Sequence, residues 1–593
     1  MEDREADWAP LSARLIKRIL TYTRPYRVRR NWLFILTFAR GLQLPALAWM
    51  IGQTINGPIA GQDLHGIYWY TGIYFALVIF MLLTLHYRQR FALELGEAVA
   101  RDMRTELFGK LMSLPMAFFN KTKFGRIISR LTSDIDSIRV AVQDVAFVVT
   151  IQIVQMTVAA GLMAWYNWKL FSLMLLLVPF IWVLNQNYRR EVSHQLRKVQ
   201  ETWSRLTSTL AESVSGVRVT QAFVRQEINA GFFKKLVNLH GENNVGVARA
   251  SAVFIPMLQM KSQLFLGTMA LVSGFGALRW HGWLHMNVGD LVMFFFLANF
   301  FFEPVQVIGN QYNQALAAMA GAERYFRLID MPPQWSDAAD SRPLPRLHGR
   351  VEFQNVSFAY EAGRPVLSDI NFVAEAGQTV ALVGPTGSGK STIAALLQKF
   401  YLPDSGRVLV DGHDLRKAKS DSLHVQMGSV QQSNFLFTGS IIDNIRFARP
   451  NAIVDDVRAT LRSLDCLDLL EGLPAGLETQ VGEKSSALSL GQRQLICFAR
   501  ALLADPRIVV LDEATSAIDT VTEARLQRAL EVLLRGRTAF VVAHRLSTIR
   551  KADLVLVLEH GRIVERGTHN TLLAAGGLYA RLHEEFISGH HEP

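Results

Sequence analysis

The stretch "GPTGSGKST", residues 384–392, decides the fold of the second half of this chain. It follows the apolar run "TVALV" (379–383) and precedes the helical run "IAALLQKF" (393–400). An apolar strand, a glycine-rich loop and a helix in this order are the setting of a phosphate-binding P-loop. Gly387 and Gly389 permit the tight backbone geometry in which N–H groups surround phosphates. A chance glycine-rich turn would not combine these elements with a Lys-Ser pair.

Polar side chains at two places carry the chemistry that this loop predicts. Lys390 supplies a point charge to the β- and γ-phosphates, and Ser391 supplies a hydroxyl ligand for Mg²⁺. The stretch "RIVVLDEATSAID" (507–519) places Asp512 at the C-terminal end of an apolar strand, where ligands bind in such sheets. Asp512 is expected to hold Mg²⁺ through water, and Glu513 to polarise an attacking water. A DE pair alone often only ends a strand, but beside a P-loop it predicts a site for ATP and Mg²⁺.

The sequence after about residue 330 is typical of an α/β domain. A polar, proline-rich linker, "DMPPQWSDAADSRPLPRLHG", precedes it. Strand-like runs then alternate with helical runs, which predicts a largely parallel sheet. We place strands at "RVEFQNVSFAY", "QTVALVG", "GRVLVDG", "RIVVLDEA", "TAFVVAH" and "LVLVLEHGRIVERG".

The first half of the chain consists of long apolar runs. Half of the 593 residues are hydrophobic and only 19% are charged, a balance typical of a membrane protein with a soluble part. Six runs approach or exceed the ~20 residues that a membrane helix needs, and a soluble core could hardly hide them. We therefore predict an all-α six-helix transmembrane domain with spans at 32–58, 66–88, 142–166, 168–188, 252–279 and 287–309.

The connections between the spans predict the topology. Short loops join the spans in pairs, whereas roughly fifty to sixty mostly polar residues follow the second and the fourth span. These long connectors begin with the basic stretches "YRQR" (87–90) and "YRR" (188–190), and "RPYRVRR" (24–30) precedes the first span. Because Lys and Arg mark the cytosolic side, both termini and both connectors are predicted to face the cytosol.

Charge and cysteine content argue against other classes of protein. A net charge of +11 could suggest a nucleic-acid partner, but the basic residues cluster beside apolar spans, so we predict none. The two cysteines allow neither a disulfide framework nor a zinc site and fit a reducing cytosol. The acidic start "MEDREADWAP" argues against a cleaved signal peptide or a transit peptide.

Polar residues within the predicted spans allow two interpretations. Ionisable groups at membrane depth are costly and usually face a cavity or a partner. One interpretation is a polar substrate path, with Glu303 paired to Arg40 or Lys261. The other is structural pairing, or long side chains that reach the interface. The residues concerned are Arg40, Gln43, Gln259, Lys261 and Glu303.

With these motifs in place, the chain resembles a half-transporter of the exporter type among the ABC transporters, over nearly its whole length. Tyr360, in "VSFAY", matches the aromatic residue that stacks on adenine, although alone it could be strand filling. Gln432, in "VQQSNFLF", matches the glutamine that links Mg²⁺ and water to the membrane domain. His544, in "VAHRLSTI", matches the switch histidine near the γ-phosphate, although a lone histidine there is usually a loop or core residue.

The resemblance implies an α/β P-loop ATPase domain of ABC type, with Glu513, His544 and Gln432 as catalytic residues. It implies that Mg²⁺ is held at Ser391, Gln432 and Asp512. Two cytosolic stretches, 114–136 and 210–227, look like the family's loops whose short transverse helices dock on ATPase domains. The implied ATP-binding set is Tyr360, Gly384, Pro385, Thr386, Gly387, Ser388, Gly389, Lys390, Ser391, Thr392 and Asp512.

A second anion-binding motif, "LSLGQ" (488–492), matches the family signature at Ser489, Gly491 and Gln492. In the family two ATPase domains stack head to tail, and each site joins one chain's P-loop to the other chain's signature. The resemblance therefore implies that this motif acts in trans, together with Asp519 in "SAID". Leu490 departs from the family's LSGGQ, and its side chain would obstruct a backbone approach to phosphate.

That departure leaves two dimer types open. In heterodimeric members with one weak site, the chain that keeps the catalytic glutamate is often the chain whose signature departs, which modestly favours a heterodimer with a second ABC half-transporter. The other interpretation is a homodimer that tolerates Leu490. The predicted domains are a cytosolic lead (1–30), a six-span transmembrane domain (31–325), a linker (326–346) and an ABC nucleotide-binding domain (347–593).

We expect ATP-driven export of amphipathic small molecules, drugs or lipids, across a bacterial inner membrane, with membrane lipids as further partners. The alternatives are a homodimeric lipid flippase and an ATP-gated channel or regulator, against which the intact Glu513 and His544 argue. A soluble ABC-type ATPase that acts on DNA or ribosomes conflicts with the six spans. The sequence does not choose between drug and lipid.

Overall fold

A computed structural model describes residues 11–279, 287–331, 337, 340–361, 363–482, 488–512, 520–543 and 546–588. These residues form two compact units. The first comprises Met1–Met112 and Phe124–Met331, and the second comprises Ser113–Lys123 and Pro332–Pro593. The short helix α4 (Met116–Lys121) therefore folds with the C-terminal part of the chain, although more than two hundred residues separate them.

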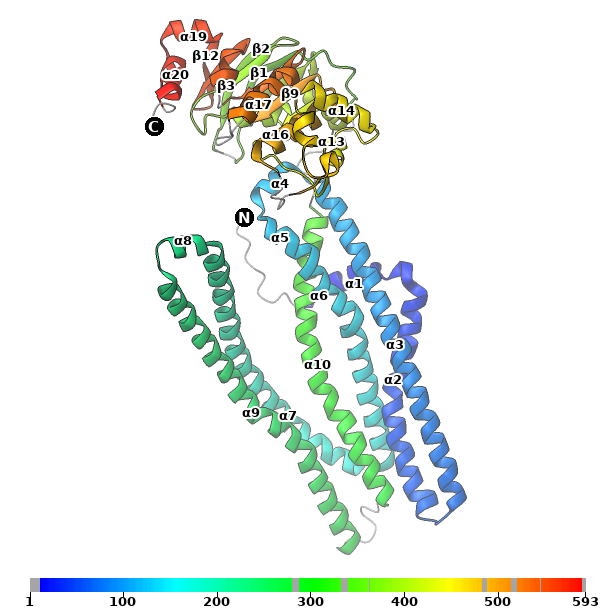
Figure 1. Cartoon of the computed structure of the whole chain (residues 1–593). Coiled ribbons are helices and arrows are strands. Elements are labelled where there is room, and N and C mark those ends of the chain that lie inside the picture. The colour runs from blue at the N-terminus through cyan, green and yellow to red at the C-terminus, as the bar shows by residue number, and fades with distance from the viewer. Residues whose placement is uncertain are drawn as a thin grey trace. The chain divides into compact units, whose positions relative to one another are not determined.

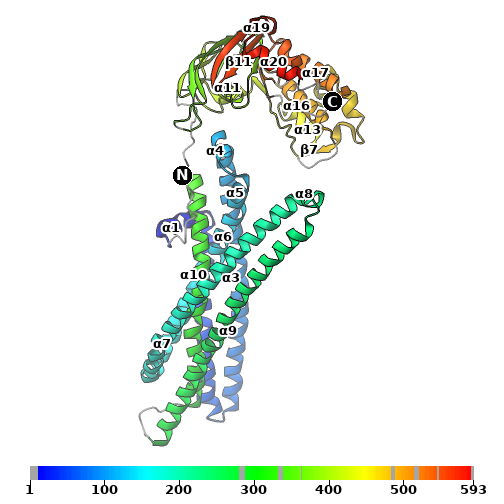
Figure 2. The same cartoon turned by 90° about the vertical axis from the view of Figure 1, so that its left-hand side faces the viewer.

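The first unit is built from long helices, shown in Figures 1 and 2. One of them, α7, contains a kink at Asn167 (φ −156°, ψ 93°), where the side-chain oxygen accepts hydrogen bonds from the backbone N–H groups of Lys169 and Leu170. Asn167 thus begins a second helical arm. The six predicted spans correspond to the two arms of α7 (Ala146–Ser215) and to four other helices: α2 (Arg27–Thr54), α3 (Leu64–Met112), α9 (Gln226–Arg279) and α10 (Val288–Ile329).

Several of these helices are longer than a membrane is thick. The 49 residues of α3 extend for about 74 Å at 1.5 Å per residue, against about 30 Å of hydrocarbon. The long connectors are thus helical continuations of the spans, and α8 (Val217–Ala222) joins the ends of α7 and α9 (Figure 2). Within the described residues, four segments are long and apolar enough to cross a membrane: Arg24–Ile59, Leu64–Met112, Phe124–Ser172 and Val288–Ile329.

Short helical elements and buried ion pairs hold the long helices together. Arg324 of α10 donates two hydrogen bonds, of 2.9 and 2.6 Å, to the buried carboxylate of Asp134. Helix α10 continues to Ile329, past the predicted linker start at 326, because Tyr325 and Phe326 pack inside the unit. The short elements are α1 (Ala13–Thr21), η1 (Arg24–Tyr26), η2 (Ile55–Ile59), α5 (Phe124–Ser129), η3 (Arg130–Asp134), α6 (Ile135–Val140) and η4 (Ala141–Val145).

The second unit contains a six-stranded sheet in the order β12-β11-β3-β10-β9-β6, parallel except for β12 at its edge. A separate antiparallel sheet has the order β2-β1-β4-β5, and β7 pairs with β8. The strands are β1 (Val351–Phe358), β2 (Leu367–Ala374), β3 (Thr379–Val383), β4 (Ser405–Val410), β5 (His413–Asp414), β6 (Met427–Val430), β7 (Gly439–Ser440), β8 (Gln480–Val481), β9 (Ile508–Asp512), β10 (Thr538–Val542), β11 (Leu554–Glu559) and β12 (Arg562–Gly567).

Two apolar cores lie on opposite faces of the parallel sheet. Successive residues of β3 alternate between them, since Ala381 and Val383 belong to one core and Val380 and Leu382 to the other. The first core is covered by helices that include α13, α14, α16 and α17, and the second by α11 and the antiparallel sheet. The helices are α11 (Lys390–Leu397), α12 (Ser420–His424), α13 (Ile441–Arg446), α14 (Val454–Ser463), α15 (Leu467–Glu471), α16 (Leu490–Leu503), α17 (Thr520–Leu534), α18 (Leu546–Arg550), α19 (His569–Ala575) and α20 (Leu578–Ser588), with η5 (Leu415–Lys417) and η6 (Gly476–Glu478).

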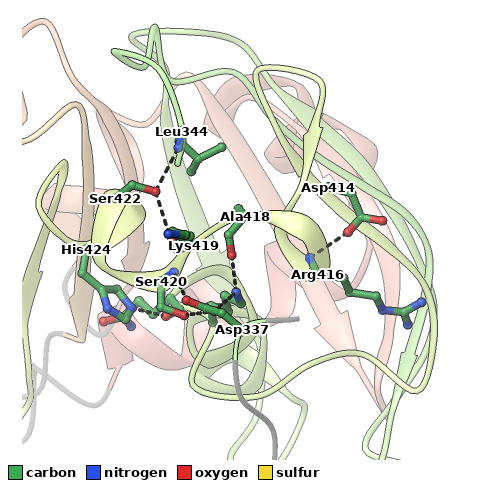
Figure 3. A network of polar contacts seen from close by, with 11 residues as sticks. Asp337, Leu344, Asp414, Arg416, Ala418, Lys419, Ser420, Ser422 and His424 are labelled. Atoms are coloured by element: carbon green, nitrogen blue, oxygen red, sulfur yellow. Dashed lines mark hydrogen bonds and ion pairs between the residues drawn. The ribbon is translucent and has the colours of Figure 1, made fainter. Parts of the chain in front are cut away.

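Asp337, within the predicted linker, is tied into the second unit by a polar network (Figure 3). The ammonium of Lys399, whose side chain is only 1% exposed, donates to the Asp337 carboxylate at 2.7 Å and to the Ala418 carbonyl at 2.5 Å. Asp337 also accepts from the backbone N–H and the hydroxyl of Ser420, at 2.9 and 2.7 Å. Burial alone would raise the pKa of Asp337, but the hydrogen bonds from Lys399 and Ser420 outweigh it and lower that pKa.

Replacing Asp337 with asparagine should destabilise the second unit by about 3 kcal/mol, because a buried lysine charge loses its partner. The full loss of stability is expected above about pH 4, the pKa of Asp337 in the unfolded chain. The loss should vanish as the pH falls through the lowered pKa that Asp337 has in the folded protein. The measurement is thermal unfolding of the full chain at several pH values. Asp340→Asn, an exposed position in the same segment, is the matched control. Equal melting temperatures for both variants would contradict the role of this ion pair.

Candidate functional site

The P-loop connects β3 to α11 and has the backbone that its glycines predict. Gly384 has φ +150°, and a Cβ atom there would lie 2.2 Å from the carbonyl oxygen of Leu558. Gly389, at the N-cap of α11, has φ +105°. Side chains at either position would strain the loop or collide with β11, so glycine is required for this path. The loop consequently brings the N-terminus of α11 to the carboxyl ends of the parallel strands.

Lys390 lies folded back into this loop. Its ammonium donates to the carbonyl oxygens of Gly384 and Pro385, at 2.8 and 2.9 Å, and the residue is only 8% exposed. Burial lowers the pKa of Lys390, while the negative charge of Asp512 opposes this shift. A cation held by two carbonyls at the end of a glycine-rich loop is placed to meet an anion.

Five chain segments meet beside this loop around a cavity of about 660 Å³, and α4 supplies one of them. Asp512 ends β9, and Gln432 follows β6, the neighbouring strand, in which Val430 pairs with Leu511. Ser391 comes from the first turn of α11, and Tyr360 comes from the segment after β1. The parallel register of β6 and β9 therefore brings Gln432 close to Asp512 on the wall of this cavity.

An aromatic cluster borders this cavity and a second one of about 820 Å³. Tyr360 is 40% exposed, and its ring meets those of Phe358 and Tyr401 edge-on at 4.9 and 5.0 Å. Its hydroxyl lies 3.1 Å from that of Thr392. Tyr401 was not predicted from the sequence, nor was Asn120 of α4, whose amide donates to the Tyr401 hydroxyl at 2.9 Å. Only the aromatic pair in "KFYLPD" could have signalled the cluster.

The groups around the loop fit a magnesium nucleotide. The hydroxyl oxygen of Ser388 is buried and has no hydrogen-bond partner within the described residues, so the loop contains a polar atom that a phosphate would satisfy. Ser391, Gln432 and Asp512 offer hydroxyl, amide and carboxylate oxygens on the wall of one cavity, and oxygen ligands suit Mg²⁺. The remaining P-loop residues, Thr386 and Gly387, lie exposed between Pro385 and Ser388.

The signature segment lies at the N-terminus of α16. Ser489 is the N-cap, and its hydroxyl accepts from the backbone N–H of Gln492 while the Gln492 side chain accepts from the Ser489 N–H. Gly491 is buried, whereas Leu490 is 42% exposed. Among the described residues, neither the cavity of about 660 Å³ nor the cavity of about 820 Å³ has a signature residue in its wall.

Three predicted site residues, Glu513, Asp519 and His544, lie outside the described residues. Asp512 and Ala543, their neighbours in the chain, end β9 and follow β10 at the same edge of the sheet. The predicted site is thus described for the P-loop, Tyr360, Gln432, Asp512 and the signature.

Only some of the polar residues in the predicted spans contact one another. Gln43 is buried and donates to the hydroxyl of Thr84 on α3 at 3.0 Å, and Arg40 lies 3.4 Å from the Gln43 carbonyl oxygen. Glu303 is exposed and does not form the expected ion pair with Arg40, which points instead to Gln43. The side chains of Gln259 and Lys261 lie outside the described residues.

Comparison with protein families finds two matches, one in each half of the chain. Residues 32–305 match the ABC transporter transmembrane region, and residues 367–516 match the ABC transporter family that carries the P-loop. The chain belongs to the ABC transporter family. The P-loop, Gln432, the signature and Asp512 lie within the second matched region, whereas Tyr360, Asp519 and His544 lie outside it.

Relatives of this ABC transporter extend the match over nearly its whole length. An ATP-dependent lipid A-core flippase of Pseudomonas fluorescens is 32% identical, over 98% of both chains. A Bacillus subtilis protein named "Probable multidrug resistance ABC transporter ATP-binding/permease protein" is 36% identical, over 86% of this chain and 76% of the relative. A solved structure of a bacterial Atm1-family ABC exporter with ATP bound has a TM-score of 0.78 and 26% identity, and covers 96% of this chain and 99% of that one.

The ABC transporter is therefore an exporter-type ATPase with fused domains. Its ATPase domain binds nucleotide, and ATP hydrolysis is coupled to transport by the helical domain. It is a multi-pass membrane protein, and half-transporters of this type work as dimers.

Proposed function

We propose that this chain exports amphipathic small molecules, lipids or drugs, from the cytosol across a bacterial inner membrane. The observation that carries the proposal is the gathering of Tyr360, Ser391, Gln432 and Asp512 on one cavity beside a P-loop, in a chain whose other half consists of membrane-length helices. The two relatives, named for lipid A-core flipping and multidrug resistance, support an amphipathic substrate, and their bacterial sources support the location.

In this proposal the residues of the chain divide the work of hydrolysis. Tyr360 stacks on adenine, the P-loop N–H groups and Lys390 hold the phosphates, and Ser391, Gln432 and Asp512 would hold the metal. When bound, Mg²⁺ neutralises charge on the phosphate oxygens. Glu513 orients and deprotonates the attacking water. His544 would contact the γ-phosphate, and Asp519 with the signature would complete the site of a partner chain.

Transport against a gradient tests this function. Inside-out membrane vesicles that contain the dimer should accumulate a labelled phospholipid or drug when supplied with ATP and Mg²⁺. Accumulation above the outside concentration is expected for a pump. Equilibration without accumulation would instead support the ATP-gated channel.

We propose further that the dimer is a heterodimer, since Leu490 is exposed at the N-terminus of α16 and would meet a partner's nucleotide. The chain alone in lipid nanodiscs should then hydrolyse little ATP, and a second ABC half-transporter should restore turnover. Robust magnesium-dependent activity of the chain alone would contradict this and establish a homodimer that tolerates Leu490.

Replacing Leu490 with glycine should raise ATP turnover of the assembled dimer severalfold, because an isobutyl group no longer separates backbone N–H groups from phosphate. Since the side chain is 42% exposed, the change should cost about 1 kcal/mol of stability or less. The measurement is the rate of phosphate release with and without the substitution. Leu573→Gly, at a similarly exposed leucine in α19, controls for a general effect of glycine. An unchanged rate would remove the argument for obstruction.

A further inference from the structure

A cavity of about 400 Å³ in the first unit is lined almost entirely by apolar side chains. Its walls come from α1, the first turns of α2, η4 with the start of α7, and the middle of α10. Leu20, Phe34, Val145, Phe147 and Ile308 are typical of the lining. The cavity is separate from the nucleotide site, which belongs to the second unit.

The wall formed by α1 is fixed rather than loosely placed. Arg18 makes a bidentate ion pair with Asp330, with contacts of 2.6 and 2.8 Å, and its guanidinium lies 3.8 Å above the ring of Phe326. Tyr22, just after α1, donates to Glu106 at 2.5 Å. Ile19, the residue after Arg18 in α1, is buried. These contacts hold α1 against the helices around it, so the space behind it is preformed.

Four polar residues interrupt the apolar lining: Thr23, Arg30, Gln311 and Tyr312. Arg30 makes no ion pair within the described residues, and its only side-chain contacts are long ones to Thr23 and Asn31, at 3.4 and 3.3 Å. The side-chain oxygen of Gln311 is buried and has no hydrogen-bond partner within the described residues. A buried amide without a partner is costly, and a partner inside the cavity would relieve that cost.

The surroundings of the cavity indicate the boundary between water and lipid. The first apolar membrane segment begins at Arg24, so Arg30 lies near its start. Arg40 follows ten residues later, about 15 Å further along the helix. Leu20 and Phe34, two apolar residues of the lining, are 46% and 45% exposed. Helix α1 also carries bases beside its apolar face, as helices that lie at membrane surfaces do. The basic stretch 24–30 suits the anionic cytosolic leaflet.

We propose that this cavity binds one acyl chain of an anionic phospholipid from the cytosolic leaflet. The apolar walls receive the hydrocarbon, Arg30 meets the phosphate, and Gln311 bonds to the ester or glycerol oxygens, since its amide offers both donors and an acceptor. A charged headgroup at Arg30 and an apolar tail behind α1 match the two ends of the site. The inference does not depend on which molecule the protein exports.

The full chain in nanodiscs that contain phosphatidylglycerol with a photoreactive acyl chain tests this proposal. Labelled peptides should concentrate on α1, 141–149 and 308–319, and phosphatidylcholine with the same acyl chain should label them about fivefold less, the worth of one basic contact. Arg30→Ala should abolish that difference, whereas Arg27→Ala, an exposed arginine on the same helix that does not line the cavity, should preserve it.

A second pair of variants tests the volume of the cavity independently. Ala315→Phe fills the space from α10 and should lower labelling severalfold, while Ala317→Phe, on the exposed side of the same helix, should leave it unchanged. Labelling that is equal on the lipid-facing residues Ile79 and Phe80 of α3 would overturn the proposal. So would equal labelling by the two headgroups in the unmodified protein, which would mean that Arg30 does not select an anion.

Discussion

Replacing Lys390 with alanine should lower the rate of ATP hydrolysis by about 100- to 1,000-fold, the usual cost of losing one preorganised charge stabiliser. The ammonium of Lys390 lies in the P-loop between the carbonyls of Gly384 and Pro385. These are neutral acceptors, so a phosphate group can replace them with a stronger, charge-assisted bond. Nucleotide affinity should also fall, because the lysine contacts phosphate before as well as during the reaction. The measurements are phosphate release and binding of a fluorescent nucleotide.

The matched control is Lys417→Ala, an exposed lysine of the same unit outside both P-loop cavities. It should hydrolyse ATP at the normal rate. The Lys390 variant should keep its melting temperature within a few degrees, since the loop path depends on its glycines and not on the ammonium. Near-normal turnover in the Lys390 variant would contradict the assignment of this loop as the phosphate site.

The candidate site was largely predictable because its residues occur in short local patterns. The P-loop needs a strand, glycines, Lys390 and Ser391 within about fifteen positions, and Asp512 marks the end of an apolar strand. Residues that join the site only through tertiary packing were missed. Tyr401 and Asn120 are 281 positions apart, and nothing near either residue in the sequence indicates their contact.

The fold was predictable where the pattern is long and missed where it is short. Six apolar runs predicted six spans, and helical elements cover each run, although helices such as α3 and α7 continue far past it. Within the described residues, four segments are long and apolar enough to cross a membrane. β2, β6 and the two-residue strands β5, β7 and β8 were missed. β6 has only four residues and includes Gly428, and β2 carries polar residues on the face that the antiparallel sheet leaves exposed. The antiparallel sheet itself depends on pairings between segments about fifty positions apart, which alternation alone does not specify.

A substitution at Glu513 should separate the rate of ATP hydrolysis from nucleotide affinity most clearly. Glu513 follows Asp512, the last residue of β9, directly in the sequence. Two adjacent carboxylates at the carboxyl edge of a parallel sheet can divide the roles of metal ligand and general base. Asp512 lies on the cavity wall with Ser391 and Gln432. We therefore propose that Asp512 serves the metal and that Glu513 serves the attacking water.

Glu513→Gln should therefore lower kcat by roughly 100- to 10,000-fold while nucleotide affinity stays within about twofold. Glutamine has the same size and keeps a hydrogen-bonding oxygen, but it cannot accept the proton of the attacking water at neutral pH. Lys390→Ala should lower both turnover and nucleotide affinity, whereas Glu513→Gln should lower turnover alone, since only the lysine contributes to ground-state binding. Glu478→Gln, an exposed glutamate of the same unit, is the control and should change neither quantity. A Glu513 variant that hydrolyses ATP normally would move the general base to another residue, and one that loses affinity together with turnover would make Glu513 a metal or nucleotide ligand instead.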